Sequence, residues 1–338
     1  MRFEFYHSGL DDVAKLSVDG TVSNSVHFSH WQGNETPGEV KADTSTEIAL
    51  NLVGSPNKDE LTQGIELVTN NHFDTDGVLS VWTMLNGERA LGLSDKLIPA
   101  AEAGDFSEFT NENAIRASIA IQGSDQPITG NEAGSPLANQ LAGAFVDDDA
   151  RAYALVLPEV ERLLMRTDEY ENLWRAPWQQ IATALESFER GASTVEEFND
   201  ATLSLITIAN EVFGPSGFDP ERHAAPFTAI SRYAKGKLFL IAIPYQKGWA
   251  YRIDYPYYSW AETIVRPRIT RRDLSPLLSR LNQLERSAGR WNLDSSELAS
   301  AAKFIGGDGK LAASTLEPDQ VADAIRAELG SSEAAAAG

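Results

Sequence analysis

The pattern of apolar and polar residues between positions 65 and 85 predicts a strand, a polar loop and a helix in succession. An apolar run, Ile65 to Val68, leads into a polar stretch at 69–77, and a second apolar run, Val78 to Leu85, follows. Strand, loop and helix make half of a βαβ unit. In open α/β sheets, ligands bind beyond the carboxyl ends of the strands, where this loop would lie.

A second strand–loop–helix unit precedes the first. Residues 25–31 alternate between apolar and polar side chains, and the polar loop 32–38 follows them. Thr44, with Glu47 three residues later, fits a capping box at the start of a helix. Residues 2–6 alternate weakly and are expected to form an edge strand.

The two loops are expected to meet if the strands at 25–31 and 65–70 are parallel neighbours, because the carboxyl ends of parallel strands share one edge of a sheet. Polar side chains from both loops would then face one another. These are His30, Asn34 and Asp43 from the earlier unit and His72, Asp74 and Asp76 from the later one.

The rest of the chain is expected to be more mixed. Residues 95–109 suit a helix, 115–121 suit either a strand or a helix, and the Gly/Ser/Pro-rich stretch 123–136 suits a flexible loop or domain boundary. From 137 to 212 apolar residues recur at three- and four-residue spacings, and a further helix is expected to open at Ser193 or Thr194.

After this helical block the pattern changes again. Residues 237–245 and 249–255 predict a β-hairpin turning at Lys247 and Gly248. Later helices are expected at three places: one capped by Thr270 and Asp273, one near Trp291 and Asp294, and one from Pro318 to Leu329 that stops at Gly330.

We therefore predict an α/β fold: a mostly parallel sheet with flanking helices, a helical insertion and a smaller C-terminal α+β part. The expected parts are an α/β metal-site domain at 1–135, a helical segment at 136–235, a C-terminal α+β domain at 236–330 and a disordered tail at 331–338.

Composition narrows the class of protein. The 338 residues are 42% hydrophobic and 9% aromatic, which is enough for a full core, and there is no cysteine for a disulfide, a thiol nucleophile or a Cys-ligated metal. No apolar run reaches the roughly 18 residues of a membrane span, and we expect no secretory signal, because residues 1–6 carry charges and no long apolar stretch follows them. A net charge of −21 disfavours long nucleic acid and anionic membranes as partners. We expect a cytoplasmic protein.

His72, Asp74 and Asp76 alternate along the loop at 69–77 and are the main candidates for metal ligands. One imidazole and two carboxylates suit Mn²⁺, Fe²⁺ or Zn²⁺ better than Ca²⁺. His30 and Asp105 are candidates to complete the ligand set. Asp and Gly are also ordinary loop residues, so Asp76 could instead cap the next helix, and Asp105 could be a loop residue after Gly104.

Other residues are candidates for binding an anionic substrate. The hydroxyls of Thr44 and Ser45 at a helix N-terminus, with Asn34, could hold a phosphate or carboxylate, or could simply cap the helix. Four arginines lie within residues 266–272. Arg268, Arg271 and Arg272 could bind the substrate anion, or the group could pair with acidic neighbours.

The run from His72 to Gly77, followed by Ser80, resembles the first motif of the DHH phosphoesterase superfamily, a strand followed by His-x-Asp-x-Asp-Gly/Ala and a helix. The resemblance implies that His72, Asp74 and Asp76 hold Mn²⁺-type ions for hydrolysis of phosphoester or phosphoanhydride bonds, and that Asp105 is similar to a later ligand aspartate. The Asp-His-His triplet of that superfamily is absent.

The same residues also resemble motif one of haloacid-dehalogenase-type phosphatases. That resemblance implies that Asp74 is the phosphorylated nucleophile, Asp76 the general acid/base and Mg²⁺ the cofactor. The loop after His30 and Trp31, taken with the later loop, is also similar to an uncharacterised bacterial family without assigned function.

The resulting hypothesis is a hydrolase that depends on a divalent metal (Mn, Mg, Fe or Zn) and acts on a small phosphorylated molecule, with His72, Asp74 and Asp76 as catalytic residues. A haloacid-dehalogenase-like phosphatase is one alternative. A non-catalytic protein that binds a small ligand on the same scaffold is another, and a metal site for other chemistry, such as amide hydrolysis, is a third.

Overall fold

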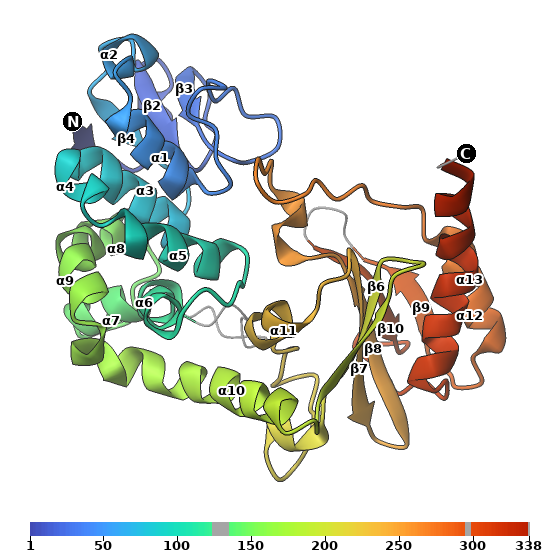
Figure 1. Ribbon diagram of the computed structural model, residues 1–338. Helices are drawn as coiled ribbons and strands as arrows, with labels where there is room; N and C mark the ends of the chain where they lie inside the picture. The colour runs from blue at the N-terminus through green and yellow to red at the C-terminus, as the bar shows by residue number, and fades with distance from the viewer. Residues whose placement is uncertain (124–134, 295–298, 337–338) are drawn as a thin grey trace. The chain divides into compact units, whose positions relative to one another are not determined.

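The computed structural model describes residues 1–123, 135–294 and 299–336 (Figure 1). The chain forms two compact units. The first contains Met1–Trp178 and Trp260–Arg268, and the second contains Gln179–Ser259 and Ile269–Gly338. The predicted α/β class is confirmed, with one parallel four-stranded sheet and one mixed six-stranded sheet. The boundaries expected near residues 135 and 235 stay predictions.

The first unit contains the parallel sheet, in the order β1-β4-β2-β3. Its strands are β1 (Arg2–Phe3), β2 (Lys15–Val18), β3 (Ser25–Phe28) and β4 (Leu67–Thr69). All neighbouring pairs are parallel, and β1 lies at the edge as expected. The expectation that the strands at 25–31 and 65–70 are direct neighbours is wrong, because β2 lies between them. Since all three are parallel, their following loops still open at one edge.

Strand β2 and its exit loop carry unusual features. Leu16 and Val18 are fully buried, and so is Lys15. The Lys15 ammonium donates hydrogen bonds to the carbonyl oxygens of Leu10, Val13 and Asn24, which satisfies its three donors. Only residues 19–24 connect β2 to β3, much less than the dozen or so usual between parallel strands. The connection closes with left-handed backbone at both ends, φ 62° at Asp19 and 51° at Asn24.

Helices make up most of the rest of the first unit. They are α1 (Ser45–Gly54), α2 (Lys58–Leu61), α3 (Thr75–Asn86), α4 (Glu88–Leu91), α5 (Ser94–Asp105), α6 (Glu112–Gln122), α7 (Pro136–Ala142), α8 (Asp149–Val156) and α9 (Val160–Met165), with 3₁₀ turns at Ser8–Leu10, Leu157–Glu159 and Thr167–Tyr170. Helix α10 (Glu171–Glu189) continues from the first unit into the second. The cap predicted for α1 is confirmed, since the Thr44 side chain accepts a hydrogen bond from the Glu47 N–H. Residues 115–121 are helical, within α6.

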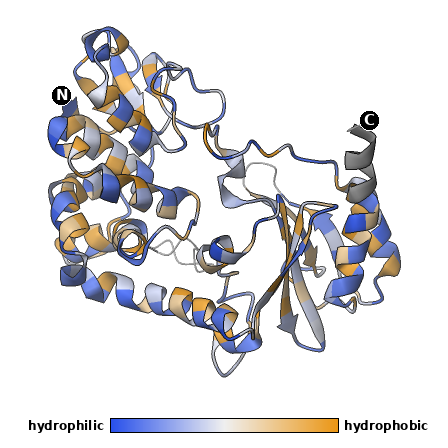
Figure 2. Ribbon diagram, in the orientation of Figure 1, coloured by the Kyte–Doolittle hydropathy of each residue, from blue (hydrophilic) through white to orange (hydrophobic). Residues whose placement is uncertain are grey.

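The second unit is organised on the six-stranded sheet, in the order β5-β6-β7-β8-β10-β9. Its elements are β5 (Thr194–Phe198), β6 (Leu203–Thr207), β7 (Leu238–Tyr245), β8 (Gly248–Asp254), β9 (Arg290–Leu293), β10 (Ser300–Ile305), α11 (Phe227–Tyr233), α12 (Ser275–Leu284) and α13 (Pro318–Ala336), with 3₁₀ turns at Asn210–Phe213 and Tyr257–Trp260. The predicted β7–β8 hairpin is confirmed. Helices α12 and α13 cover one face, and their apolar residues share a core with the largely hydrophobic strand β7 (Figure 2).

Several local predictions are wrong. The helix expected at Ser193 or Thr194 is the hairpin β5–β6, because cross-strand pairing in the sheet prevails over the local Glu-rich start signal. The helix expected near Trp291 is replaced by strands β9 and β10 on either side of 295–298, which lie outside the described residues. Helix α12 has Leu274 in its N-cap position and no side-chain cap there, so the cap predicted from Thr270 is wrong, although the Asp273 carboxylate accepts from the Ser275 N–H at 2.9 Å.

The C-terminal end also differs from the prediction. Helix α13 continues past Gly330 to Ala336, where a disordered tail was expected. One glycine costs a helix only about 1 kcal/mol, and the alanine-rich residues after it favour helix. The loop or boundary expected at 123–136 falls mostly on residues 124–134, outside the described part of the chain.

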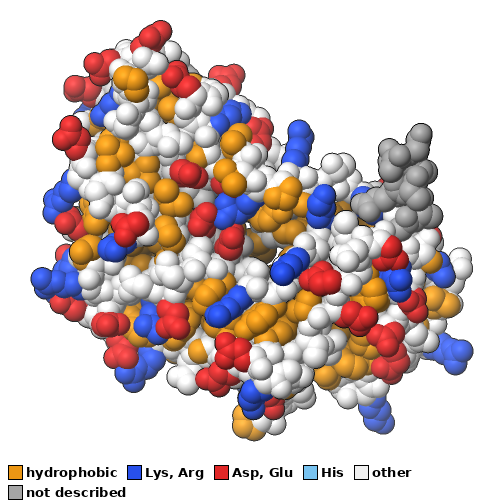
Figure 3. Space-filling view, viewed as in Figure 1, with side chains coloured by type: hydrophobic (Ala, Val, Ile, Leu, Met, Phe, Trp, Pro, Cys, Tyr) orange, Lys and Arg blue, Asp and Glu red, His pale blue; other side chains and the backbone are white. Residues whose placement is uncertain are grey.

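The described helices include none with both the length and the apolar character needed to cross a membrane. On the face shown in Figure 3, acidic side chains are interspersed with basic ones rather than separated into large patches of one sign.

Candidate metal centre

The carboxyl edge of the parallel sheet gathers acidic and histidine side chains from five segments. Asp19 directly follows β2, and His30 lies two residues after β3. His72 and Asp74 lie in the loop after β4. Asp76 lies in the first turn of α3 and Asp105 is the last residue of α5. The sheet topology therefore brings together residues that are up to 86 positions apart in the chain (105 − 19).

Four of these residues form a fully buried group. Asp19, His30, Asp76 and Asp105 offer donor atoms that all lie within 4.8 Å of one another. From His30 Nε2 the nearest carboxylate oxygens are 3.1 Å away on Asp105, 3.5 Å on Asp19 and 3.7 Å on Asp76. Three carboxylates around one imidazole nitrogen, closed off from water, form a set that could hold a divalent cation.

The ring of His30 is oriented by its other nitrogen. Nδ1 lies 2.7 Å from the backbone oxygen of Asp43, so Nδ1–H donates to this carbonyl. Nε2 then faces the three carboxylates, and among the described residues it has no partner with hydrogen-bond geometry. A ring nitrogen held by a backbone carbonyl, with its opposite nitrogen left open, is the usual arrangement of a metal-ligating histidine.

A second group shares Asp19 with the first. Asp19, His72 and Asp74 also offer donor atoms within 4.8 Å of one another. His72 Nε2 lies 2.9 Å from Asp19 Oδ2 and 3.2 Å from Asp74 Oδ2. The side chains of His72 and Asp74 are 29% and 20% exposed, so this group is open to solvent where the first is closed. Asp19 faces His30 with Oδ1 and His72 with Oδ2, so one carboxylate connects both groups.

Electrostatic interactions in the two groups shift every imidazole in one direction. Burial acts to lower the pKa of His30, but the carboxylates of Asp105, Asp76 and Asp19 raise it to about 10. Burial likewise opposes the shift at His72, where Asp74 and Asp19 raise the pKa to about 12. Both imidazoles are therefore protonated at neutral pH and balance part of the charge of the carboxylates. A bound cation would take over this role and displace the protons.

The carboxyl groups are shifted in opposite directions. Burial, with the charge of Asp19, raises the pKa of Asp76 to about 7. Burial also raises the pKa of Asp105, and the charges of Asp74 and Asp76 add to this. Burial acts to raise the pKa of Asp19, but His72 and His30 outweigh it and lower the value to about 2. Asp19 is thus the carboxylate that stays ionised in the centre of the site.

A protein-family model, a family of unknown function (DUF6687), matches residues 2–316. The chain belongs to this family. A search of curated proteins finds no match. This outcome agrees with the resemblance to a family without assigned function, and the relation to the DHH phosphoesterase superfamily stays a prediction.

Among solved structures, one similar chain is the pGpG-specific phosphodiesterase PggH of Vibrio cholerae, at 12% sequence identity. The alignment covers 94% of this chain and 99% of that chain, with a TM-score of 0.34. This score is too low to establish a common fold.

The N-terminus of α1 has a different partner from the predicted anion. The Asp76 carboxylate accepts hydrogen bonds from the backbone N–H of Ser45 at 2.7 Å and of Thr46 at 2.8 Å. The Ser45 hydroxyl donates to Asp19 Oδ1 at 2.9 Å. Thr44 caps α1, and Asp74 rather than Asp76 caps α3 by accepting from the Gly77 N–H. Ser45 and the start of α1 therefore hold the acidic residues of the site, and substrate binding by Thr44 and Ser45 stays a prediction.

The other predicted substrate-binding residues lie elsewhere. The Asn34 amide donates to Trp31 O and to Glu262. Arg268 is exposed in the first unit, whereas Arg271 and Arg272 belong to the second, where Arg271 lies over the Tyr255 ring and Arg272 donates to Leu329 O. Their binding of a substrate anion stays a prediction.

Sequence reasoning missed Asp19. A short alternating stretch, Lys15 to Val18, followed by Asp-Gly, signals a strand and a turn, and could have placed an aspartate at the same edge. Asn70 was also missed. Its side chain accepts from the backbone N–H of Gly20 and Asn71 and donates to the Tyr153 hydroxyl, which in turn donates to His72 O. Asn70 thus joins the loop after β2 to the loop after β4.

Proposed function

We propose that the first unit holds two divalent metal ions that share Asp19, and that the protein is a metal-dependent hydrolase of small phosphorylated molecules. The observation that carries this proposal is the buried His30 Nε2, which has no hydrogen-bond partner among the described residues and faces three carboxylates. Buried like charges are costly without a compensating cation. A cation between these four side chains would replace the His30 proton and balance the charge of the carboxylates.

The donor sets suit the expected metals. Each group combines imidazole nitrogen with carboxylate oxygen, a mixture that Mn²⁺, Fe²⁺ and Zn²⁺ accept, while Mg²⁺ prefers oxygen alone. His30, Asp76 and Asp105 would hold the inner ion, His72 and Asp74 the outer one, and Asp19 both. Paired ions of this kind activate water and stabilise charge on phosphoryl oxygens.

The residues themselves have distinct tasks in this proposal. The inner group, made of Asp19, His30, Asp76 and Asp105, is closed off from water. Its Asp19 and Asp76 are held in place by hydrogen bonds from Ser45 and Thr46 at the N-terminus of α1. The outer group is the side that a substrate can reach, because His72 and Asp74 are partly exposed. A phosphate group bound there would lie beside the carboxylate that both groups share.

The test is a metal titration of protein stripped with chelator. Wild type is expected to bind close to two Mn²⁺ per chain and to hydrolyse members of a panel of phosphomonoesters, phosphodiesters and phosphoanhydrides only with metal. Asp76→Asn should lose the inner ion and all hydrolysis. The matched control is Asp95→Asn, at the opposite, exposed end of the helix that carries Asp105, and it should behave as wild type.

The outcomes separate the candidate functions. No metal bound by wild type, or hydrolysis unaffected in Asp76→Asn, would overturn the proposal. Tight metal binding without turnover of any substrate in the panel would support a binding protein instead. A covalent phosphoryl group trapped on Asp74 would support the haloacid-dehalogenase-like alternative, in which that residue is the nucleophile.

A further inference from the structure

The segment Trp260–Arg268 is part of the first unit, although the chain on both sides of it belongs to the second. It leaves the second unit after Ser259 and rejoins it at Ile269. It docks on the residues that hold His30 and Asp105, two of the four side chains proposed to bind the inner ion. The docking involves two anchors, one at each end of the segment.

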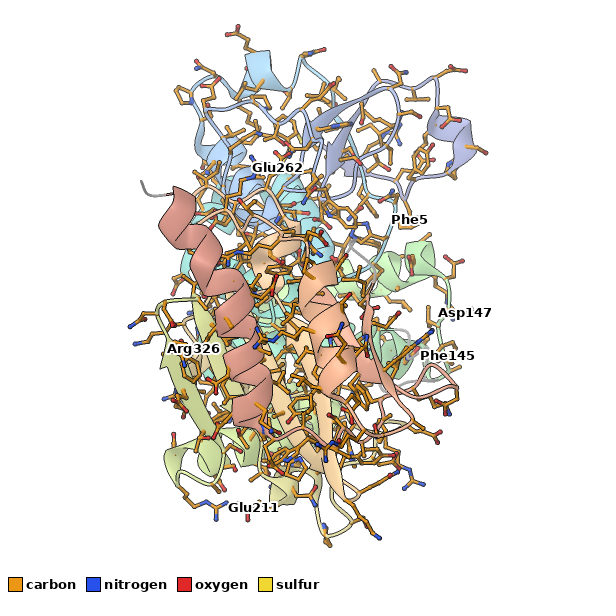
Figure 4. All side chains as sticks on the ribbon, turned by 90° about the vertical axis from the view of Figure 1, so that its right-hand side faces the viewer. Phe5, Phe145, Asp147, Glu211, Glu262 and Arg326 are labelled. Atoms are coloured by element: carbon orange, nitrogen blue, oxygen red, sulfur yellow. The ribbon has the colours of Figure 1, made fainter. Side chains whose placement is uncertain are left out.

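The first anchor is Glu262, labelled in Figure 4. Its backbone N–H donates to the carbonyl oxygen of His30 at 2.7 Å. Its carboxylate accepts from the Gly33 N–H at 3.0 Å, the Asn34 amide at 2.9 Å and the Lys41 ammonium at 3.2 Å. The neighbouring Trp260 packs edge-on against the His30 ring, with 4.9 Å between centroids. His30 is therefore held on its backbone and on its ring face.

The second anchor is Asp43. Its carboxylate accepts the three successive backbone N–H groups of residues 264–266, at 2.5, 2.8 and 3.0 Å, and the Arg266 guanidinium at 2.8 Å. The backbone carbonyl of the same residue accepts from His30 Nδ1. One residue thus connects the docked segment to the ring orientation of a proposed metal ligand.

Arg266 extends this anchor to a second ligand. Its guanidinium also pairs with Glu102 at 2.7 Å and with Glu108 at 2.5 Å. Glu102 and Glu108 lie three residues before and three residues after Asp105. Arg266 therefore joins the residues before α1 to the end of α5, where the Asp105 carboxylate enters the inner group. The guanidinium is largely buried, with 15% of the side chain exposed.

We propose that Trp260–Arg268 is a positioning segment for the inner metal ion, so that docking of this segment and binding of that ion stabilise each other. This inference rests on the metal-binding part of the proposed function and does not depend on hydrolysis. If the docked segment fixes His30 and Asp105, it raises affinity for the ion. By thermodynamic linkage the ion must then strengthen docking by the same factor.

The first test is Arg266→Ala, followed by Mn²⁺ titration of chelator-stripped protein. Residues that orient metal ligands typically change affinity by about 10–100-fold, so we expect a loss of roughly tenfold at one of the two positions. A titration of His72→Ala shows which binding step belongs to the outer ion, because that step is lost. Arg266→Ala should weaken the other step, which belongs to the inner ion. The matched control is Arg175→Ala, which removes an exposed ion pair with Glu171 and should not alter either step.

The second test measures the reciprocal effect. Amide hydrogen exchange of residues 262–266 should slow when Mn²⁺ is added to wild type, and should not respond in Asp105→Asn, which lacks an inner ligand. Arg266→Lys keeps the charge but not the forked geometry, and should restore part of the affinity. Glu262→Ala, at the other anchor, is a second variant that should weaken the same step if Arg266→Ala does not fold.

Two results would overturn the inference. The first is a variant, Arg266→Ala or Glu262→Ala, in which the amides of residues 262–266 exchange freely but Mn²⁺ binds at both positions as tightly as in wild type. The other is segment protection that does not respond to metal in wild type. Wild type that binds Mn²⁺ but hydrolyses nothing would remove the proposed activity and leave this linkage standing, whereas wild type that binds no metal would remove both.

Discussion

Asp105→Asn is expected to have opposite effects on stability with and without metal. Asp105 shares a buried group with Asp19 and Asp76, and burial and the nearby carboxylates raise its pKa above the ordinary value of 3.8. An acid whose pKa is raised on folding costs stability at pH above its unfolded value. Without metal at neutral pH, asparagine removes that cost, so the variant should be as stable as wild type or more stable.

With metal bound, wild type should be more stable than Asp105→Asn. A ligand that binds only the folded state stabilises it by about 2.7 kcal/mol at a concentration 100 times its Kd. In a unit of this size, 1 kcal/mol corresponds to about 2–4 °C in Tm, so filling the inner position should raise Tm by roughly 5–10 °C. Asp105→Asn replaces an anionic ligand by a neutral amide and should lose most of this rise.

The assay is thermal unfolding of wild type, Asp105→Asn and Asp95→Asn, each after chelator treatment and again with saturating Mn²⁺. Circular dichroism gives Tm, and element analysis confirms the metal content of each sample. The reasoning is refuted if Asp105→Asn is several degrees less stable than wild type without metal, since the carboxylate would then be a stabilising group. It is also refuted if the variant keeps the full metal-dependent rise.

Three further predictions concern pH and packing. Mn²⁺ affinity should rise with pH across roughly pH 6–9 with release of at least two protons, measured by calorimetry in buffers of different ionisation heat. The raised pKa values of His30 and His72 mean that metal must displace their protons, and Asp76, with a pKa raised to about 7, adds to the release at the lower end of this range. A pH-independent affinity would contradict this. Gly77→Ala should destabilise the protein by about 1–3 kcal/mol in urea unfolding. A Cβ at this position would lie 2.4 Å from Asn70 Nδ2 and 2.6 Å from the Tyr153 hydroxyl. The control Gly54→Ala, whose Cβ would have only a 3.7 Å contact, should be neutral or stabilising. Glu285→Gln should cost the second unit about 1 kcal/mol at neutral pH, a value discounted for partial exposure. Hydrogen bonds from Ser314 and Thr315 outweigh burial and lower the pKa of Glu285 to about 2, so its contribution is present above pH 4.5 and should vanish as the pH falls towards 2. A constant difference between the two proteins over that range would contradict the assignment.

Local signals sufficed where chemistry and secondary structure coincide in a short stretch. The alternation of His72, Asp74 and Asp76 between an apolar strand and an apolar helix located one edge of the sheet. The Thr44 cap correctly predicted the start of helix α1, which packs at this edge. A strand ending near His30 was enough to predict that this residue lies close to Asp76. These inferences need only hydrophobic period, capping and the rule that parallel strands end together.

Long-range pairing lay beyond those signals. Strand β2 is only four residues long and contains a lysine, so its apolar pattern is weak, yet it separates β3 from β4 and delivers Asp19. The docking of Trp260–Arg268 on Asp43 joins positions more than 200 residues apart, and no local pattern encodes it. The arginines at 266–272 suggested an anion site, whereas Arg266 pairs with Asp43, Glu102 and Glu108, as the ion-pairing alternative proposed.

Asp19 is the position at which backbone and chemistry impose the same requirement. Its φ of 62° lies in the left-handed region, which glycine, asparagine and aspartate adopt at least cost. Glycine would satisfy the turn but supply no ligand, and asparagine would supply no charge between His30 and His72. A β-branched or larger side chain would strain the short connection to β3. Aspartate meets both demands, because it adopts this backbone conformation at low cost and places a carboxylate between His30 and His72.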